Sequence, residues 1–243
     1  MIKVIFFDID NTLLSFDEYV RDAMRTGFAL FRIGTYDESM FGVFQTVNNA
    51  LWQEIEQGTL TLEELRKFRW NRIFSALGLS FDGPTFETFF RERLNESAIP
   101  EPGAVPVLES LSRKYPLCAA SNGPYRQQEN RLRIAGMLPY FSHLFISGEL
   151  GAPKPSALFF DGCMERLKKG ASFPLSPHFD KTAAEQIRPE EILMVGDSLT
   201  ADMDGAAAYG MQTCFYNPKG LSVSAKPHLT LEIRTLPELL NLL

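Results

Sequence analysis

Short apolar runs alternate with amphipathic patterns over most of this chain, and the alternation is the feature that most restricts its fold. Six runs have the length and composition of strands, at residues 4–9, 116–120, 144–147, 192–195, 213–216 and 228–233. Helical patterns follow several of them, at residues 105–114, 125–135, 157–167, 200–209 and 236–243. Such alternation predicts the α/β class, with a Rossmann-like parallel sheet core that carries helices on both faces.

Residues 18–96 interrupt this alternation, because they contain no convincing strand. Apolar side chains recur there at helical spacing, among them Leu62, Leu65, Phe68 and Phe74. We therefore expect an inserted α-helical domain at 18–96 and a core formed by residues 1–17 and 97–243. A second departure, the Gly-, Pro- and Ser-rich segment 168–189, is expected to be an enlarged surface loop.

The net charge of the protein limits the kinds of partner that it is expected to bind. The 243 residues carry a formal net charge of −6, and no run of basic residues occurs. This composition argues against nucleic acid polymers as partners. A protein of this charge that handles an anionic substrate must build a local positive site from a metal ion, a lysine or backbone amides.

Cysteine usage and hydropathy predict a cytoplasmic protein with no membrane partner. Cys118, Cys163 and Cys214 are odd in number and widely separated, so core thiols are the expected role. The N-terminus enters an apolar strand directly, without the pattern of a signal peptide, and no apolar run approaches membrane-spanning length.

Two carboxylates stand at the end of the first strand, in the run Asp8-Ile9-Asp10-Asn11-Thr12. In that position Asp8 and Asp10 could serve as a nucleophile and an acid/base, or as metal ligands. The same run could be a helix cap followed by Asn-Thr turn chemistry. Alone, the motif leaves both interpretations open.

Three further polar features follow later strands. Ser121 and Asn122 could hold a phosphoryl oxygen, although Ser-Asn-Gly is also an everyday turn. Lys154 lies between two prolines and could counter phosphate or clustered carboxylates, although most lysines are solvated surface charges. Asp197 ends the fourth strand, and Asp202 falls in the first turn of the next helix, where it could be only a cap.

These features should meet, since the carboxyl ends of parallel strands share one edge of a sheet. Asp197 beside Asp8 and Asp10 would bring three like charges together, an arrangement that a divalent cation would relieve.

In this order the four features resemble the motifs of the haloacid dehalogenase superfamily, matching Asp8-x-Asp10-x-Thr12, Ser121, Lys154 and Gly196-Asp197-x4-Asp202. The resemblance implies a Rossmann-like core and makes segment 18–96 a helical C1 cap. Dehalogenases of the superfamily lack the second Asp of the first motif, whereas phosphatases keep it, so Asp10 implies phosphoryl transfer. Asn11 stands where glycine is often found, which argues against a sugar-phosphate mutase.

The resemblance also implies a role for each matching residue. Asp8 would attack phosphorus and form an aspartyl-phosphate, and Asp10 would protonate the leaving oxygen and then activate water. Mg²⁺ would be held by Asp8, the Asp10 carbonyl and Asp197, with Asp202 in support. Lys154 would act with Asp8 and Asp10 in catalysis. The phosphoryl oxygens would be bound by Thr12, Ser121, Asn122 and Lys154.

A closer resemblance is to bacterial pyrimidine 5'-nucleotidases, and it rests on Val47-Asn-Asn-Ala-Leu-Trp52, Gly58-Thr-Leu-Thr61 and Asp-Asn-Thr-Leu in the first motif. It implies a 5'-nucleotidase acting on nucleoside monophosphates. Four aromatic side chains are candidates to stack on a base: Phe16, Tyr19, Phe44 and Trp52.

Two alternatives stay open at this point. One is a sugar-phosphate or phosphoglycolate-type phosphatase acting on a small metabolite. The other, not enzymatic, is a regulatory binding module on the same fold. In each case the expected partner is a small phosphorylated metabolite, and the protein is expected to be a monomer or a homodimer.

Overall fold

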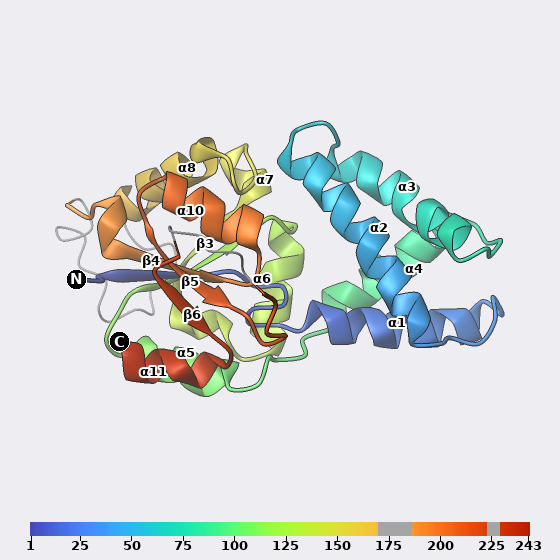
Figure 1. Cartoon of the computed structure of the whole chain (residues 1–243), viewed down its shortest axis with the longest axis horizontal. Helices are drawn as coiled ribbons and strands as arrows, with labels where there is room; N and C mark the ends of the chain where they lie inside the picture. Colours follow the sequence, from blue (N-terminus) through green and yellow to red (C-terminus); the bar gives the residue numbers. More distant parts are fainter. Residues whose placement is uncertain (170–185, 223–228) are drawn as a thin grey trace. The chain divides into compact units, whose positions relative to one another are not determined.

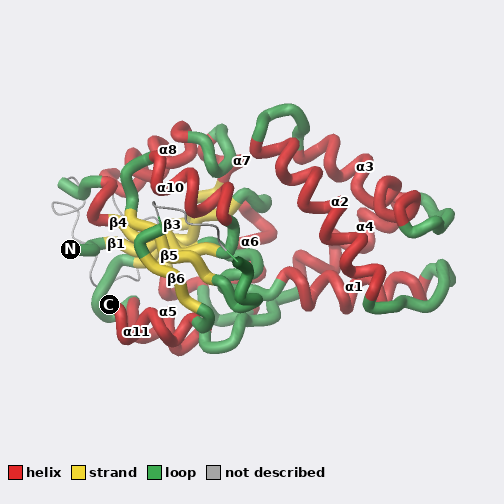
Figure 2. The backbone as a smooth tube through the Cα atoms, viewed as in Figure 1, coloured by secondary structure: helices red, strands yellow, loops and turns green. Residues whose placement is uncertain are grey.

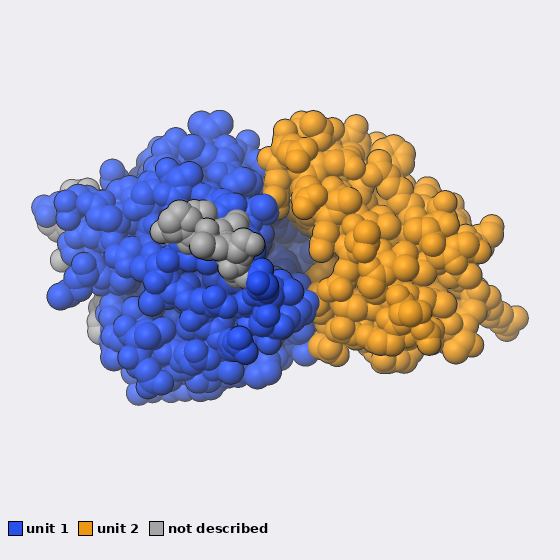
Figure 3. Space-filling model, viewed as in Figure 1, with its two compact units in different colours: residues 1–15, 98–243 blue, residues 16–97 orange. Residues whose placement is uncertain are grey.

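The computed structural model describes residues 1–169, 186–222 and 229–243. By contact the chain forms two compact units, one of Met1–Ser15 and Ala98–Leu243, the other of Phe16–Ser97 (Figure 3). The catalytic role expected for the first unit and the cap role expected for the second stay predictions.

The described part of the first unit contains a six-stranded sheet in the order β3-β2-β1-β4-β5-β6 (Figure 1). Every neighbouring pair is parallel. The strands are β1 (Val4–Phe7), β2 (Leu117–Ser121), β3 (Phe141–Ile146), β4 (Ile192–Gly196), β5 (Gln212–Tyr216) and β6 (Leu231–Ile233). The order reverses at β1, between β2 and β4, and the carboxyl ends beside such a reversal are where doubly wound sheets bind ligands.

Alternate residues of the central strand face opposite sides of the sheet. Ile5 and Phe7 of β1 join one apolar cluster, whereas Val4 and Phe6 join another. Both sets are fully buried, which explains why the strand is a continuous apolar run.

Helices lie on both faces of the sheet (Figures 1 and 2), and their apolar side chains belong to the two clusters. Those on the first cluster are α5 (Ala104–Leu111), α6 (Tyr125–Ile134) and α11 (Leu239–Leu242), with the 3-10 turns η1 (Leu138–Tyr140) and η4 (Leu236–Glu238). Those on the second are α8 (Ala157–Lys169), α10 (Gly205–Ala208) and the π-helical turn η3 (Leu199–Asp204). Two short elements, α7 (Ser147–Leu150) and η2 (Pro189–Glu191), complete the described part of this unit. The predicted α/β core with helices on both faces is confirmed.

The strand boundaries differ from the expected ones where polar residues are buried. Strand β3 begins at Phe141, three residues before the predicted start at Leu144, because Ser142 and His143 are buried within it. The His143 ring stacks on Phe145. At β6 the described strand begins at Leu231. The predicted loop enlargement at 168–189 lies mostly outside the described residues.

The second unit consists of four helices: α1 (Phe16–Leu30), α2 (Ser39–Glu56), α3 (Leu62–Ala76) and α4 (Gly83–Glu96). Local sequence fixes two of their starts. Thr61 and Glu64 form a reciprocal capping box at α3. Asp82 accepts a hydrogen bond from the Thr85 amide at α4, where Pro84 suits the first turn.

The core of this unit is aromatic. Trp70 is fully buried and lies 4.2 Å from Phe86, centroid to centroid. Tyr19 and Phe44, two of the side chains considered for stacking on a base, are only 2% and 1% exposed and pack in the same cluster. Their packing role is therefore the one that the structure shows.

One apolar position of the helical pattern does not join the core. Phe68 is 45% exposed, and the neighbouring Arg69 is buried instead. Arg69 points inward because Glu87 of α4 is buried opposite it, and their side chains form two hydrogen bonds of 3.0 and 2.7 Å. Arg69 also donates to Asn48 and lies over the Phe90 ring.

All three cysteines are buried and free, as expected of core thiols. Within the described ranges, no helix combines the length and the apolar character needed to cross a bilayer.

Replacing Arg69 should destabilise the second unit strongly. Arg69→Met leaves the Glu87 carboxylate buried without its cation, so the free energy of unfolding should fall by about 3–5 kcal/mol. Urea titration followed by tryptophan fluorescence reports on this unit, because both tryptophans, Trp52 and Trp70, lie in it.

Two variants complete the experiment. Arg69→Met with Glu87→Met should recover most of the loss, since no charge is left buried. Arg72→Met removes an exposed pair with Glu54 and should cost less than about 1 kcal/mol. A double variant as unstable as the single one would contradict this account.

Candidate active site

The first motif is both a tight turn and a source of carboxylates. The Asp8 amide donates to the Val195 carbonyl, which extends the pairing of β1 with β4. The chain then folds back, with the amides of Leu13 and Leu14 both donating to the Ile9 carbonyl. Asn11 sits at a φ of 59° within this turn. Asparagine tolerates the left-handed region better than most residues, which explains how it can stand where glycine is common.

Lys154 is the charged centre of the site. Its side chain is 2% exposed, and Nζ donates to Asp8 Oδ1 at 2.7 Å, Asp202 Oδ1 at 2.6 Å and the Ala120 carbonyl at 2.7 Å. An ammonium group has three hydrogens, so each has an acceptor. Burial works against its charge, but Asp202 and Asp8 outweigh burial and raise the pKa of Lys154 above its ordinary value.

The surroundings of Asp8 act on the pKa of its carboxyl group in opposite directions. The pKa of Asp8 is raised to about 7, because burial and the charges of Asp202 and Asp10 together outweigh the lowering effect of Lys154. The lysine is the main contact that favours the anionic carboxylate.

Three carboxylates converge beside the lysine. Oxygens of Asp8, Asp197 and Asp202 all lie within 4.8 Å of one another. Asp197 accepts a hydrogen bond of 3.4 Å from the Thr12 hydroxyl. The sequence-based expectation that residues from distant segments meet at one edge of the sheet holds for these side chains.

The position of Asp202 depends on a π-helical turn and a glycine. Its Oδ1 accepts from Lys154, and its Oδ2 accepts from the Ser198 amide at 3.1 Å. A Cβ on Gly196 would lie 2.2 Å from Oδ2, so the close approach requires glycine there. Because both oxygens of Asp202 already accept hydrogen bonds, a supporting role suits it better than a direct ligand role.

The donor set fits a magnesium ion. Three carboxylates and one ammonium group leave a local charge of −2 if all are ionised, and carboxylate oxygens are the ligands that Mg²⁺ prefers. A divalent cation would offset this charge.

Asn122 holds two loops together. Its side chain donates to the Lys154 carbonyl at 3.0 Å and accepts from the Lys154 amide at 2.8 Å. The peptide bond from Lys154 to Pro155 is cis. This clamp fixes the backbone from which the lysine side chain reaches the carboxylates.

Ser121 is buried at the end of β2. Its Oγ accepts hydrogen bonds from the Gly123 amide at 3.0 Å and from Gln128 Nε2 at 2.9 Å. The serine is thus oriented by its own loop and by α6.

Sequence reasoning missed two residues of the site, Gln128 and Arg131. Both lie on α6 and are almost completely buried, at 0% and 1% exposure. Arg131 Nη1 lies 2.5 Å from Asp10 Oδ1, and Gln128 Nε2 lies 2.6 Å from Asp10 Oδ2. The available signal was their spacing, which places them on the inward side of the helix with Leu132.

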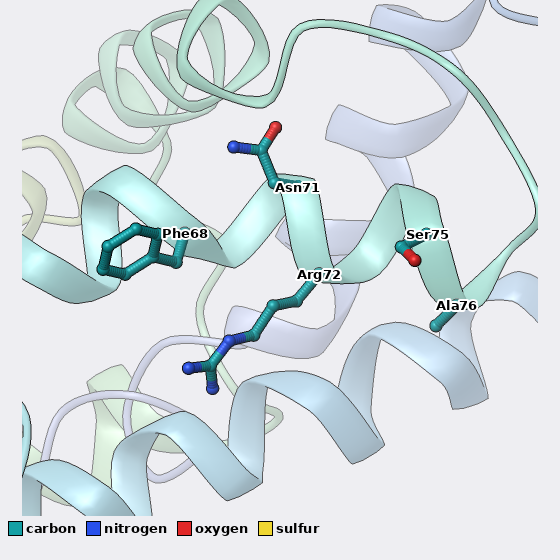
Figure 4. A pocket seen from close by; sticks show the side chains of 5 residues that line it. All are labelled: Phe68, Asn71, Arg72, Ser75 and Ala76. Carbon is teal, nitrogen blue, oxygen red and sulfur yellow. The ribbon is translucent and has the colours of Figure 1, made fainter.

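The second unit has a surface pocket, and the segment of chain that forms it contains none of these residues. It is lined by Phe68, Asn71, Arg72, Ser75 and Ala76, all from α3 (Figure 4). None of the predicted site residues lines it, and Arg72 is paired with Glu54. The pocket has no cluster of catalytic groups.

Three carboxylates and a buried lysine meet beside the carboxyl ends of β1 and β4 in a doubly wound sheet, the arrangement expected of an α/β enzyme. Residues 2–210 match the family model described as haloacid dehalogenase-like hydrolase, and the chain belongs to this family of hydrolases. The prediction of family and of an enzyme is confirmed.

Three relatives are similar to this chain over most of its length. The HAD-hydrolase YfnB of Bacillus subtilis is 30% identical over 246 residues, which cover 99% of this chain and 95% of that protein. Pyrimidine 5'-nucleotidase PynA of Streptococcus pneumoniae is 33% identical over 243 residues, covering 99% and 94%. Pyrimidine 5'-nucleotidase YjjG of Escherichia coli is 30% identical over 213 residues, covering 88% and 85%.

Solved structures agree on the fold. A crystal structure of YfnB bound to magnesium superposes with a TM-score of 0.84 at 30% identity and covers 99% of this chain and 98% of that chain. An L-2-haloacid dehalogenase of Xanthobacter autotrophicus gives a TM-score of 0.73 at 17% identity, covering 100% and 98%, a likeness of fold alone.

Magnesium should stabilise the protein by binding to Asp8 and Asp197 and by offsetting the charge of the three carboxylates. MgCl₂ at ten times its dissociation constant should add about 1.4 kcal/mol to the free energy of unfolding. For a chain of this length, that gain corresponds to a rise in Tm of roughly 2–4 °C. Differential scanning calorimetry with and without MgCl₂ measures the rise.

Two variants separate the site from general ionic effects. Asp197→Asn should abolish most of the rise, whereas Asp204→Asn, a carboxylate outside the group, should leave it intact. A full rise in the Asp197→Asn variant would rule out this metal site.

Proposed function

We propose that the protein is a Mg²⁺-dependent phosphomonoester hydrolase that acts through an aspartyl-phosphate on Asp8, with nucleoside monophosphates as its substrates. One observation carries the proposal. A buried ammonium group bridges Asp8 and Asp202, and Asp197 lies beside them, at the edge of the sheet where ligands bind.

The first step needs an anionic Asp8. Lys154 binds Asp8 Oδ1 and favours that charge, and the second oxygen would attack phosphorus. The bond from Asp8 to phosphorus forms as the bond from phosphorus to the leaving oxygen breaks. Asp10 gives its proton to that oxygen, so the alcohol leaves neutral.

The second step reverses the role of Asp10. Its carboxylate takes a proton from a water molecule, the water oxygen attacks phosphorus, and the bond to Asp8 breaks to release inorganic phosphate.

One set of groups would bind the metal ion, and another would bind the phosphoryl oxygens. Mg²⁺, held by Asp8, the Asp10 carbonyl and Asp197 with support from Asp202, would supply charge neutralisation when bound. Phosphoryl oxygens would be held by Thr12, Ser121, the Asn122 amide and Lys154. The cytoplasmic location and the monomeric or dimeric state stay predictions.

The choice of substrate rests on the two nucleotidase relatives. PynA and YjjG are both pyrimidine 5'-nucleotidases, and PynA matches almost the whole chain. Of the four aromatic candidates for stacking on a base, Tyr19 and Phe44 are buried in the core of the second unit. Phe16 and Trp52 are the partly buried ones that remain.

Asp8→Asn should abolish turnover, because an amide of nearly the same shape is not a nucleophile. The expected loss in kcat is at least about 1000-fold. Phosphate release from a monoester measures it, and intact-mass analysis should find a phosphorylated wild type but no phosphorylated variant. Activity within tenfold of wild type would end the mechanism.

A panel of phosphate monoesters with MgCl₂ tests the substrate class. Pyrimidine nucleoside monophosphates should give a kcat/KM at least about tenfold above sugar phosphates and phosphoglycolate, which a base-binding contact of about 1.4 kcal/mol provides. Equal values across the panel would remove the nucleotide assignment and leave the phosphatase mechanism standing.

A further inference from the structure

Two residues of α6 bracket the Asp10 carboxylate. Arg131 Nη1 donates to Asp10 Oδ1 at 2.5 Å, and Gln128 Nε2 donates to Asp10 Oδ2 at 2.6 Å. Each oxygen of Asp10 is therefore bound by a different side chain. Since each carboxylate oxygen offers about two lone-pair sites, both contacts leave room for a proton.

The two residues that bind Asp10 are also hydrogen-bonded to each other, and one of them binds Ser121. Arg131 Nη1 also donates to Gln128 Oε1 at 2.9 Å, and Gln128 Nε2 also donates to Ser121 Oγ at 2.9 Å. A Cβ on Gly123 would lie 2.3 Å from Gln128 Nε2, so the loop after Ser121 makes room for this amide. The network joins the end of β1 to the end of β2 through α6.

Burial makes this network costly. The Arg131 side chain is 1% exposed, whereas that of Asp10 is 33% exposed. Burying a guanidinium group carries a large desolvation penalty, and apolar residues of similar volume often stabilise a fold as well or better. A buried arginine aimed at a partly exposed carboxylate therefore points to a role in holding that carboxylate.

We propose that Arg131 and Gln128 are positioning residues that fix the orientation of Asp10 for proton transfer to the leaving oxygen and from water. This inference rests on the proposed function. Neither residue acts on phosphorus; both act through Asp10. Arg131 is the cleaner test, because Gln128 also contacts Ser121 and would alter phosphate binding.

The choice of leaving group allows the two steps of the reaction to be tested separately. The 4-nitrophenolate ion leaves without a proton, so p-nitrophenyl phosphate needs Asp10 only in the second step. A nucleoside monophosphate needs it in both. In Arg131→Met, phosphorylation by p-nitrophenyl phosphate should stay within about threefold of wild type, while steady-state turnover falls about 100-fold.

Stopped-flow absorbance should then show a burst of one nitrophenolate per active site, and phosphorylated enzyme should accumulate. With a nucleoside monophosphate, kcat should fall about 100-fold with KM changed less than threefold and no accumulation. Arg131→Lys should recover part of the loss, because it keeps a cation near Asp10.

Arg133→Met is the matched control. Arg133 lies on the same helix, is 55% exposed and pairs with Glu129, so both reactions should be unchanged. If Arg131→Met does not fold, Arg131→Lys must show the same burst with a smaller loss.

Equal losses of the burst rate and of nucleotide turnover, or no loss in either, would overturn the inference. A wild type that hydrolyses neither ester would instead overturn the proposed function, so the two failures are distinguishable.

Discussion

The buried ammonium group of Lys154 is the contact on which the site depends. Its three acceptors come from the end of β1, the end of β2 and the turn η3, segments far apart in the chain. A charge this deep is tolerated only when every donor is used. Each of these segments must therefore arrive correctly for the others to be stable, which couples the formation of the site to completion of the central sheet.

The sheet meets this demand through its order. Strand β1 lies between β2 and β4, so the residues that follow all three emerge together. Backbone contacts refine the placement. The Asp8 amide is bound to the Val195 carbonyl, and Asn122 binds both backbone polar groups of Lys154. Hydrogen bonds therefore hold the backbone at Asp8 and at Lys154 in place, which fixes the positions of these two side chains.

Apolar runs and strand ends are the features that made part of this molecule predictable from its sequence. The central strands are continuous apolar segments, and their carboxyl ends share an edge, so the meeting of Asp8 and Asp197 follows from the order of the motifs. Prediction failed where polar residues are buried. The start of β3 and the inward turn of Arg69 were missed, because their partners are known only in three dimensions. Arg131 was missed for the same reason, because its partner Asp10 lies far away in the chain.

The two carboxylates of the first motif are chemically alike and only two residues apart, yet they meet different cations. Asp8 is 8% exposed and faces an ammonium group, a compact charge that binds one oxygen and leaves the other for attack. Asp10 faces a guanidinium and an amide, whose paired contacts fix the plane of the carboxylate. A nucleophile needs one available oxygen, whereas an acid/base needs a fixed direction of proton transfer. The difference in partners therefore matches the difference in proposed roles.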